Sequence, residues 1–334
     1  MMRKKQKRIS VIALAALFGI SGCSREDTPK GCEDYTVKKE QYVDEYTEQY
    51  DYWYMVTVEY PVLSGIDEEQ EEIINKALYD MAMEKVNYWH LTPNEEVKAL
   101  QEEYSIYSND VRCDVDFHSQ YLLSVAFHET YAPVSPFNYA QMTQRCANIN
   151  LLTGEQYQPF DIFQMDDNFM ELWCKQVEAD GNYDDLIFND ADTRETFRAW
   201  FLGEYKEAEE DYIFTPFFCI DGNKDFVIGL SCDPKPGKLS GDLPKDNCFY
   251  AHFQTSDLEP YRTDSEFWEL YDESQSTGTV IENETLKENI WLGENANVWD
   301  FWEERQEKYY DDVLSQISNL SPEKKNAKER ILGR

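Results

Sequence analysis

The sequence predicts an α+β fold in which antiparallel sheets carry helices packed on them, followed by a helical C-terminal extension. Two runs of alternating apolar residues, at 111–117 and 121–127, are typical of strands with one buried face. Elsewhere apolar residues recur at helical spacing, as over 73–86 and 163–180. With 42% hydrophobic and 15% aromatic residues among 334, the chain can bury a sizeable core.

The N-terminal 22 residues have the pattern of a secretory signal peptide. Five basic residues come first, an apolar run follows at 9–20, and small residues precede Cys23. The apolar run is too short to span a membrane, which takes roughly 20 residues. We therefore expect 1–22 to be removed from the mature chain.

The end of this leader, Ile20-Ser21-Gly22-Cys23, resembles the lipobox of bacterial lipoproteins. In that family the cysteine thiol receives a diacylglycerol, and a peptidase then cuts before it. The resemblance implies that Cys23 is the lipidation site and the mature N-terminus, held at the extracytoplasmic face of the cell membrane by diacylglycerol and palmitate-type chains. The alternative is an ordinary signal peptide that has a cysteine near its end.

The charge balance restricts the class of partner. Removal of the leader leaves 312 residues (334 − 22), and the net charge changes from −35 to −40 (26 − 66). Nucleic acid is excluded as a partner, because a phosphate backbone binds basic surfaces. An acidic chain attracts cationic partners and meets them faster at low salt. The alternative is that the charge only keeps the chain soluble and away from the membrane.

Residues 23–50 are polar, acidic and rich in tyrosine, which predicts a tether between the lipid anchor and the folded body. A strand is predicted at 52–60, ended by Pro61 and Gly65. The α+β domain is expected to occupy 51–263.

The helices and strands of this domain follow in order. Asp67 is expected to cap the helix that carries the apolar spacing of 73–86. A capping box at 92–95 predicts a short helix that runs to about residue 104. Three strands, at 111–117, 121–127 and 139–151, predict an antiparallel meander.

The second half of the domain alternates in the same way. Helices are predicted at 163–180 and 192–210. Strands at 212–220 and 226–232 are expected to form a hairpin, and a further strand is expected at 249–253. The remaining residues, 264–334, predict the helical C-terminal extension.

The sequence predicts no catalytic, cofactor-binding or metal-ligating residue. No two of the four histidines lie within four positions of each other, so the donors of a catalytic zinc are missing: His90, His118, His128 and His252. The acidic run 221–225 hints at a calcium loop, but an EF-hand needs glycine and glutamate where Phe226 and Cys232 stand. A hairpin turn is the better interpretation. With 66 acids, no glycosidase pair can be singled out.

Eight cysteines occur, and seven remain if Cys23 is acylated, an odd number. There is no CxxC motif, which argues against a structural zinc site. The remaining thiols are expected to be buried small side chains or to form disulfides, and both alternatives stay open.

Five short motifs within about 56–262 follow a recognisable order: 60–65, 123–127, 148–155, 160–163 and 226–228. In this order they resemble the RsiV-like extracytoplasmic domain family, which also forms the N-terminal region of PdaC-type peptidoglycan deacetylases. The resemblance implies an α+β domain outside the membrane and a role in sensing or binding at the cell wall. It implies no catalytic residue.

These observations favour a lipid-anchored, non-enzymatic binding or sensing protein of the bacterial cell envelope. The expected partner is a cationic protein of the lysozyme kind or the cell-wall glycan. Two alternatives remain: an enzyme that acts on wall glycan, and an accessory subunit that holds a membrane complex through 264–334.

Overall fold

The computed structural model describes residues 30–46, 54–95, 107–133, 141–180, 191–204, 212–234, 248–282 and 286–287. From Gly31 onward they belong to one compact unit. This unit is a mixed α+β structure with a six-stranded sheet, a three-stranded antiparallel sheet and helices packed on them. The predicted fold class is therefore confirmed.

The six-stranded sheet has the strand order β5-β4-β3-β2-β1-β9. Its strands are β1 (Thr36–Tyr46), β2 (Tyr54–Ser64), β3 (Tyr107–His118), β4 (Leu122–Pro133), β5 (Gln141–Asn150) and β9 (Thr279–Ile281). The expected meander is present as β3-β4-β5, in which both pairings are antiparallel. Two other pairings, β2 with β3 and β1 with β9, are parallel and were not expected.

The first strand corrects the predicted tether. Residues assigned to a tether form β1, which pairs with β2 over its whole length. The alternation of buried and exposed residues that is typical of a strand was not evident in this acidic segment, although Tyr35 and Val37 are buried. Pairing with β2 along its whole length, and with β9 over residues 36–38, holds β1 in place. Such pairing does not require an apolar sequence.

Pro61 does not end β2, which continues to Ser64. Parallel pairing with β3 involves only residues 56–58 of β2. At Pro61, the side of β2 that faces away from β1 therefore has no strand hydrogen-bonded to it. Proline lacks a backbone N–H, and this is tolerated on such an unpaired side. The strand ends before Gly65, whose positive φ of 101° suits glycine.

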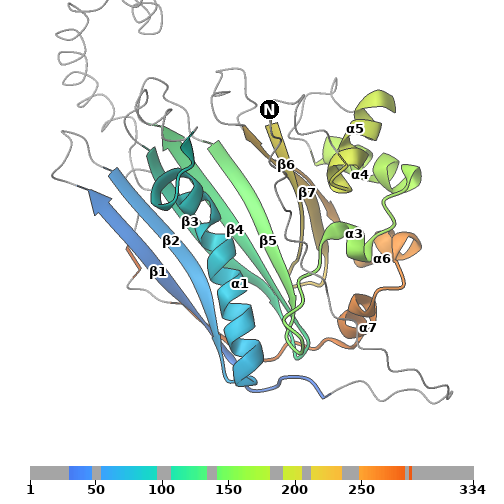
Figure 1. The fold of residues 1–334 in the computed structure, drawn as a ribbon. Coiled ribbons are helices and arrows are strands. Elements are labelled where there is room, and N and C mark those ends of the chain that lie inside the picture. Colours follow the sequence, from blue (N-terminus) through green and yellow to red (C-terminus); the bar gives the residue numbers. More distant parts are fainter. Residues whose placement is uncertain are drawn as a thin grey trace, which may run out of the picture. The chain divides into compact units, whose positions relative to one another are not determined.

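Helix α1 (Glu68–Val86) lies across one face of the six-stranded sheet (Figure 1). Asp67 caps it as predicted, since its side chain accepts from the Glu69 N–H. The Asn75 side chain binds both backbone groups of Leu63, which ties the helix to the end of β2. The helix contributes Ile74, Leu78, Ala82, Met83 and Val86 to the first hydrophobic core. A π-helical turn, η1 (Asn87–Leu91), follows it.

The three-stranded sheet, β6-β7-β8, consists of β6 (Tyr212–Ile220), β7 (Phe226–Pro234) and β8 (Cys248–Phe253). The predicted β6–β7 hairpin is confirmed, with its turn at 221–225. An aromatic second core lies between this sheet and its helices. The helices are α3 (Pro159–Ile162), α4 (Asp167–Ala179), α5 (Ala191–Phe201), α6 (Thr255–Leu258), η2 (Glu259–Tyr261) and α7 (Glu266–Glu273).

Side chains of the large sheet hold the β6 edge of the small sheet. Ser124 Oγ accepts from the Ile220 N–H at 3.0 Å, and Asn148 Nδ2 donates to the Phe218 carbonyl at 2.6 Å. Both polar side chains are buried. Serine and asparagine thus satisfy a strand edge that would otherwise be buried without partners.

The start of the predicted C-terminal extension is part of the packed body. The indole of Trp268 on α7 donates to the Ile162 carbonyl at 2.8 Å, and β9 pairs with β1. The predicted domain boundary at 263 therefore lies inside the fold.

Three predictions lie outside the described residues: most of 283–334, the leader with Cys23, and the helix predicted through residue 104. Among the residues described, no helix is long and apolar enough to cross a membrane.

Candidate binding surface

A row of three tyrosines lies on the α1 side of the six-stranded sheet. Tyr42 of β1 stands opposite Val58 of β2, and Glu40 stands opposite Tyr60. Because residues opposite each other and two positions apart share a face, Tyr42 and Tyr60 are diagonal neighbours. Tyr79 of α1 completes the row, with its ring edge-on to that of Tyr60 at a centroid distance of 5.0 Å.

Tyr79 of α1 is the most exposed ring of the row. Tyr42 and Tyr60 are half-buried and pack against the first core, and Tyr79 is 38% exposed. Partial burial raises the pKa of Tyr60, and the nearby Glu40 carboxylate and Tyr79 add to the effect. The row therefore offers accessible ring edges on a rigid support.

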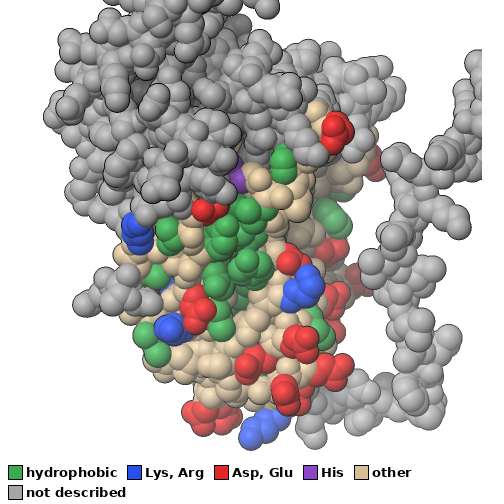
Figure 2. All heavy atoms as spheres, turned by 60° about the vertical axis from the view of Figure 1, so that its left-hand side comes forward, with side chains coloured by type: hydrophobic (Ala, Val, Ile, Leu, Met, Phe, Trp, Pro, Cys, Tyr) green, Lys and Arg blue, Asp and Glu red, His purple; other side chains and the backbone are tan. Residues whose placement is uncertain are grey.

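Charged side chains border the tyrosine row. Lys38 pairs with Glu40 on β1 at 3.5 Å, and Lys76 pairs with Asp80 on α1. All four side chains are well exposed. Figure 2, which brings the β1 side of the molecule forward, shows hydrophobic side chains gathered in one area with acidic and basic groups around it.

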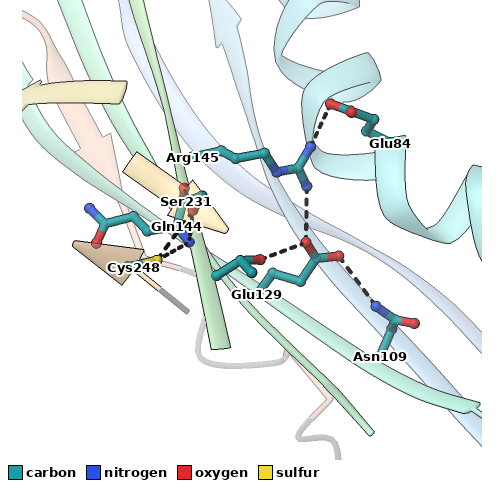
Figure 3. A network of polar contacts seen from close by, with 8 residues as sticks. Glu84, Asn109, Glu129, Gln144, Arg145, Ser231 and Cys248 are labelled. Carbon is teal, nitrogen blue, oxygen red and sulfur yellow. Dashed lines mark hydrogen bonds and ion pairs between the residues drawn. The ribbon is translucent and has the colours of Figure 1, made fainter. Parts of the chain in front are cut away.

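A network of polar side chains centred on the buried Glu129 lies on the same side of the six-stranded sheet. Glu129 of β4 accepts from Arg145 Nη2 at 3.4 Å, from Thr143 Oγ1 at 3.2 Å and from Asn109 Nδ2 at 3.3 Å. Arg145 also donates to Glu84 of α1 at 2.8 Å (Figure 3). This network joins three strands to the end of α1, and its charged side chains pair with one another. We interpret it as structural.

His90 of η1 extends this network. Its Nε2 lies 2.9 Å from Asn109 Oδ1. Since Asn109 donates to Glu129 through its amide nitrogen, Oδ1 is left to accept, and the His90 proton belongs on Nε2. Burial lowers the pKa of His90 to about 4, so the ring is neutral at pH 7.

Sequence reasoning did not single out the tyrosine row or the buried network. Glu129 and Arg145 occupy strand positions in phase with Phe127 and Ala147, which are buried. The sequence did contain a signal: in each of two neighbouring strands, a charged residue stands where the alternation calls for a buried apolar one. The tyrosines lie on three segments, and only the sheet register and α1 bring them together.

The histidines have separate local partners. His118 Nδ1 lies 2.6 Å from the Thr277 carbonyl, His128 lies 3.5 Å from Asp114, and His252 lies 3.2 Å from Asp180. Within the described ranges, no three His, Cys, Asp or Glu side chains are grouped so that they could hold a metal ion. The run 221–225 forms the hairpin turn, as predicted.

The fold and this surface define an α+β protein with two sheets, a helix-covered aromatic core and an aromatic surface row.

No family model matches the sequence, and no curated protein matches it. Two solved structures of DUF3298-family proteins, a family of unknown function, resemble the chain. One is from Bacteroides fragilis (TM-score 0.42, 11% identity, 72% of this chain and 99% of the other). One is from Pseudomonas aeruginosa (TM-score 0.37, 10% identity, 68% of this chain and 94% of the other).

Proposed function

We propose that this chain is a lipid-anchored, extracytoplasmic binding protein of the bacterial cell envelope, and that its tyrosine row takes a cationic protein of the lysozyme kind. The tyrosine row of Tyr42, Tyr60 and Tyr79 is the observation that carries the proposal. The net charge of −35, the lipobox ending at Cys23 and the RsiV-like segments support it.

The chemistry of the row suits lysine and arginine side chains. A cation over a tyrosine ring gains roughly 0.5–1 kcal/mol at an exposed site. Glu40 stands opposite Tyr60, and Asp80 follows Tyr79 on α1. Each of the two carboxylates can exchange its lysine partner for a cation of the bound protein. The acidity of the whole chain brings a cationic partner to this surface.

Binding of egg-white lysozyme to the full chain, purified in detergent, tests the proposal. We expect an affinity that falls steeply as salt rises. Tyr79→Ala should weaken binding by roughly 3-fold, the loss expected for one exposed cation–π contact. Phe160→Ala is the matched control, because Phe160 is 43% exposed and belongs to α3. Absence of binding at low salt would refute the proposal.

The anchor is tested separately in cells. Labelling with a tagged palmitate should mark the wild-type chain, and Cys23→Ser should abolish the label and release the chain from the membrane. Unchanged membrane retention of Cys23→Ser would contradict lipid anchoring and leave the lysozyme result as it stands.

Cell-wall glycan is the second candidate ligand, because tyrosine rings also stack on sugar rings. Binding to purified peptidoglycan that persists at high salt and falls in Tyr79→Ala would favour it. An enzymatic role predicts a change in the muropeptide pattern when the purified chain is incubated with cell walls.

A further inference from the structure

Two buried thiols meet where the two sheets touch. Cys146 lies on β5 and Cys219 on β6, and they share a small hydrophobic cluster with Ala126 and Phe217. Burial raises the pKa of the Cys146 thiol well above its ordinary value, and the neighbouring Cys219 adds to the rise. Gln144 Nε2 lies 3.7 Å from each sulfur, so both face the same amide.

A carboxylate completes this arrangement. The Cys219 thiol lies near the carboxyl group of Asp116 on β3. Burial raises the pKa of Asp116 to about 6, and Asp114 and Asp221 add to the rise. A carboxylate of this kind can accept the proton of a nearby thiol, which is the step that makes a thiol nucleophilic.

We propose that Cys146 and Cys219 are a redox-active pair that closes to a disulfide and links the six-stranded sheet covalently to the three-stranded sheet. The inference goes beyond the proposed binding function and does not depend on it. An oxidising compartment would favour the closed form.

The oxidant is a second disulfide, either of a small molecule or of a dithiol oxidoreductase. Cys219 passes its proton to Asp116, and its thiolate attacks the oxidant, whose S–S bond breaks and releases one thiol. Cys146 then loses its proton, and its thiolate attacks the Cys219 sulfur of the mixed disulfide, which releases the second thiol. Two protein thiols lose two electrons and two protons, and the oxidant is reduced to two thiols. Because both sulfurs are nearly buried, exchange takes place during folding or local opening.

A third sulfur lies nearby, but it faces a different partner. Cys248 Sγ is 3.1 Å from the Gln144 backbone nitrogen and 3.2 Å from Ser231 Oγ (Figure 3). It is therefore held against the main chain of β5, whereas Cys146 and Cys219 both face the side-chain amide of Gln144. The pairing we expect is specific, and its two cysteines are 73 positions apart in the sequence (219 − 146).

Peptide mapping of the full chain folded with oxidised glutathione tests the proposal. We expect a peptide containing Cys146 joined to one containing Cys219, with the mass of two hydrogens missing. The melting temperature should rise by roughly 5–10 °C relative to the chain folded with reductant. Free thiols at both positions, or a bond from either one to Cys248, would overturn the proposal.

Variants add a second readout. Cys219→Ser should lose both the cross-link and the rise in melting temperature on oxidation. Cys174→Ser, at a buried thiol of α4 in the other core, should keep both. Where Cys219→Ser fails to fold, the wild-type peptide map decides by itself. The proposal fails if Cys219→Ser still shows the oxidation-dependent rise.

Discussion

Arg145 and Glu129 form an ion pair that is almost entirely inside the protein. Their side chains are 6% and 2% exposed, and Arg145 Nη2 lies 3.4 Å from Glu129 Oε2. The pair lies between α1 and the six-stranded sheet and is continued by the hydrogen bonds from Asn109 and Thr143. Both charges therefore depend on the surrounding fold to stay satisfied.

Removal of one partner should be costly. We expect Arg145→Met to lower the free energy of unfolding by about 3–5 kcal/mol, because Glu129 is left as a buried charge with only neutral donors. Urea denaturation followed by tryptophan fluorescence measures this change. Lys76→Met, which removes an exposed i,i+4 pair on α1, is the control and should leave the midpoint unchanged. Equal midpoints for the two variants would contradict the structural role of the network.

His90 should make the fold sensitive to mild acid. Its pKa is about 4 in the folded chain and 6.5 for an ordinary histidine, so the unfolded state binds the proton more tightly between these limits. Stability from the neutral ring is fully present above about pH 6.5 and is lost as the pH falls toward 4. His90→Gln should flatten the stability curve in this window by on the order of 2 kcal/mol. An unchanged slope between pH 6.5 and 4 would be inconsistent with a half-buried ring that stays neutral.

Asp116 should act in the opposite direction. Its pKa is raised from 3.8 to about 6, so the folded state binds the proton more tightly and stability falls as the pH rises through this window. We expect Asp116→Asn to be more stable than wild type at pH 7.5, by on the order of 1 kcal/mol, and equal to it below about pH 4. Melting curves at several pH values measure the difference. Asp264→Asn, at an exposed aspartate, serves as the control.

Gly229 of β7 is predicted to tolerate no side chain. A Cβ there would lie 2.5 Å from the Phe249 carbonyl and 2.6 Å from the Phe217 ring. Gly229→Ala should therefore destabilise the three-stranded sheet by about 1–3 kcal/mol through overpacking. Gly222→Ala in the β6–β7 turn is the matched control, because its nearest neighbour would be 3.9 Å away. Thermal unfolding compares them, and similar losses in both would contradict this reason.

Local periodicity predicted most of the elements correctly. The β3-β4-β5 meander, the β6–β7 hairpin and α1 with its Asp67 cap follow from alternation, turn residues and helical spacing. Local periodicity missed β1, because pairing along the whole of β2 does not require an apolar pattern. The prediction that Pro61 ends β2 was wrong, because one side of β2 has no strand paired to it at that residue. The parallel pairings β2–β3 and β1–β9 were also missed, since they join segments far apart in the sequence.

The α+β class, the order of most strands and helices, and the acidity could be predicted from the sequence, because they depend on composition and on residues close together in the chain. The side chains that meet across the fold could not be predicted in this way. The register of β1 against β2, with α1 beside them, assembles the tyrosine row of Tyr42, Tyr60 and Tyr79. Contact between β5 and β6 brings Cys146 to Cys219. Such meetings depend on long-range packing, which no local pattern encodes.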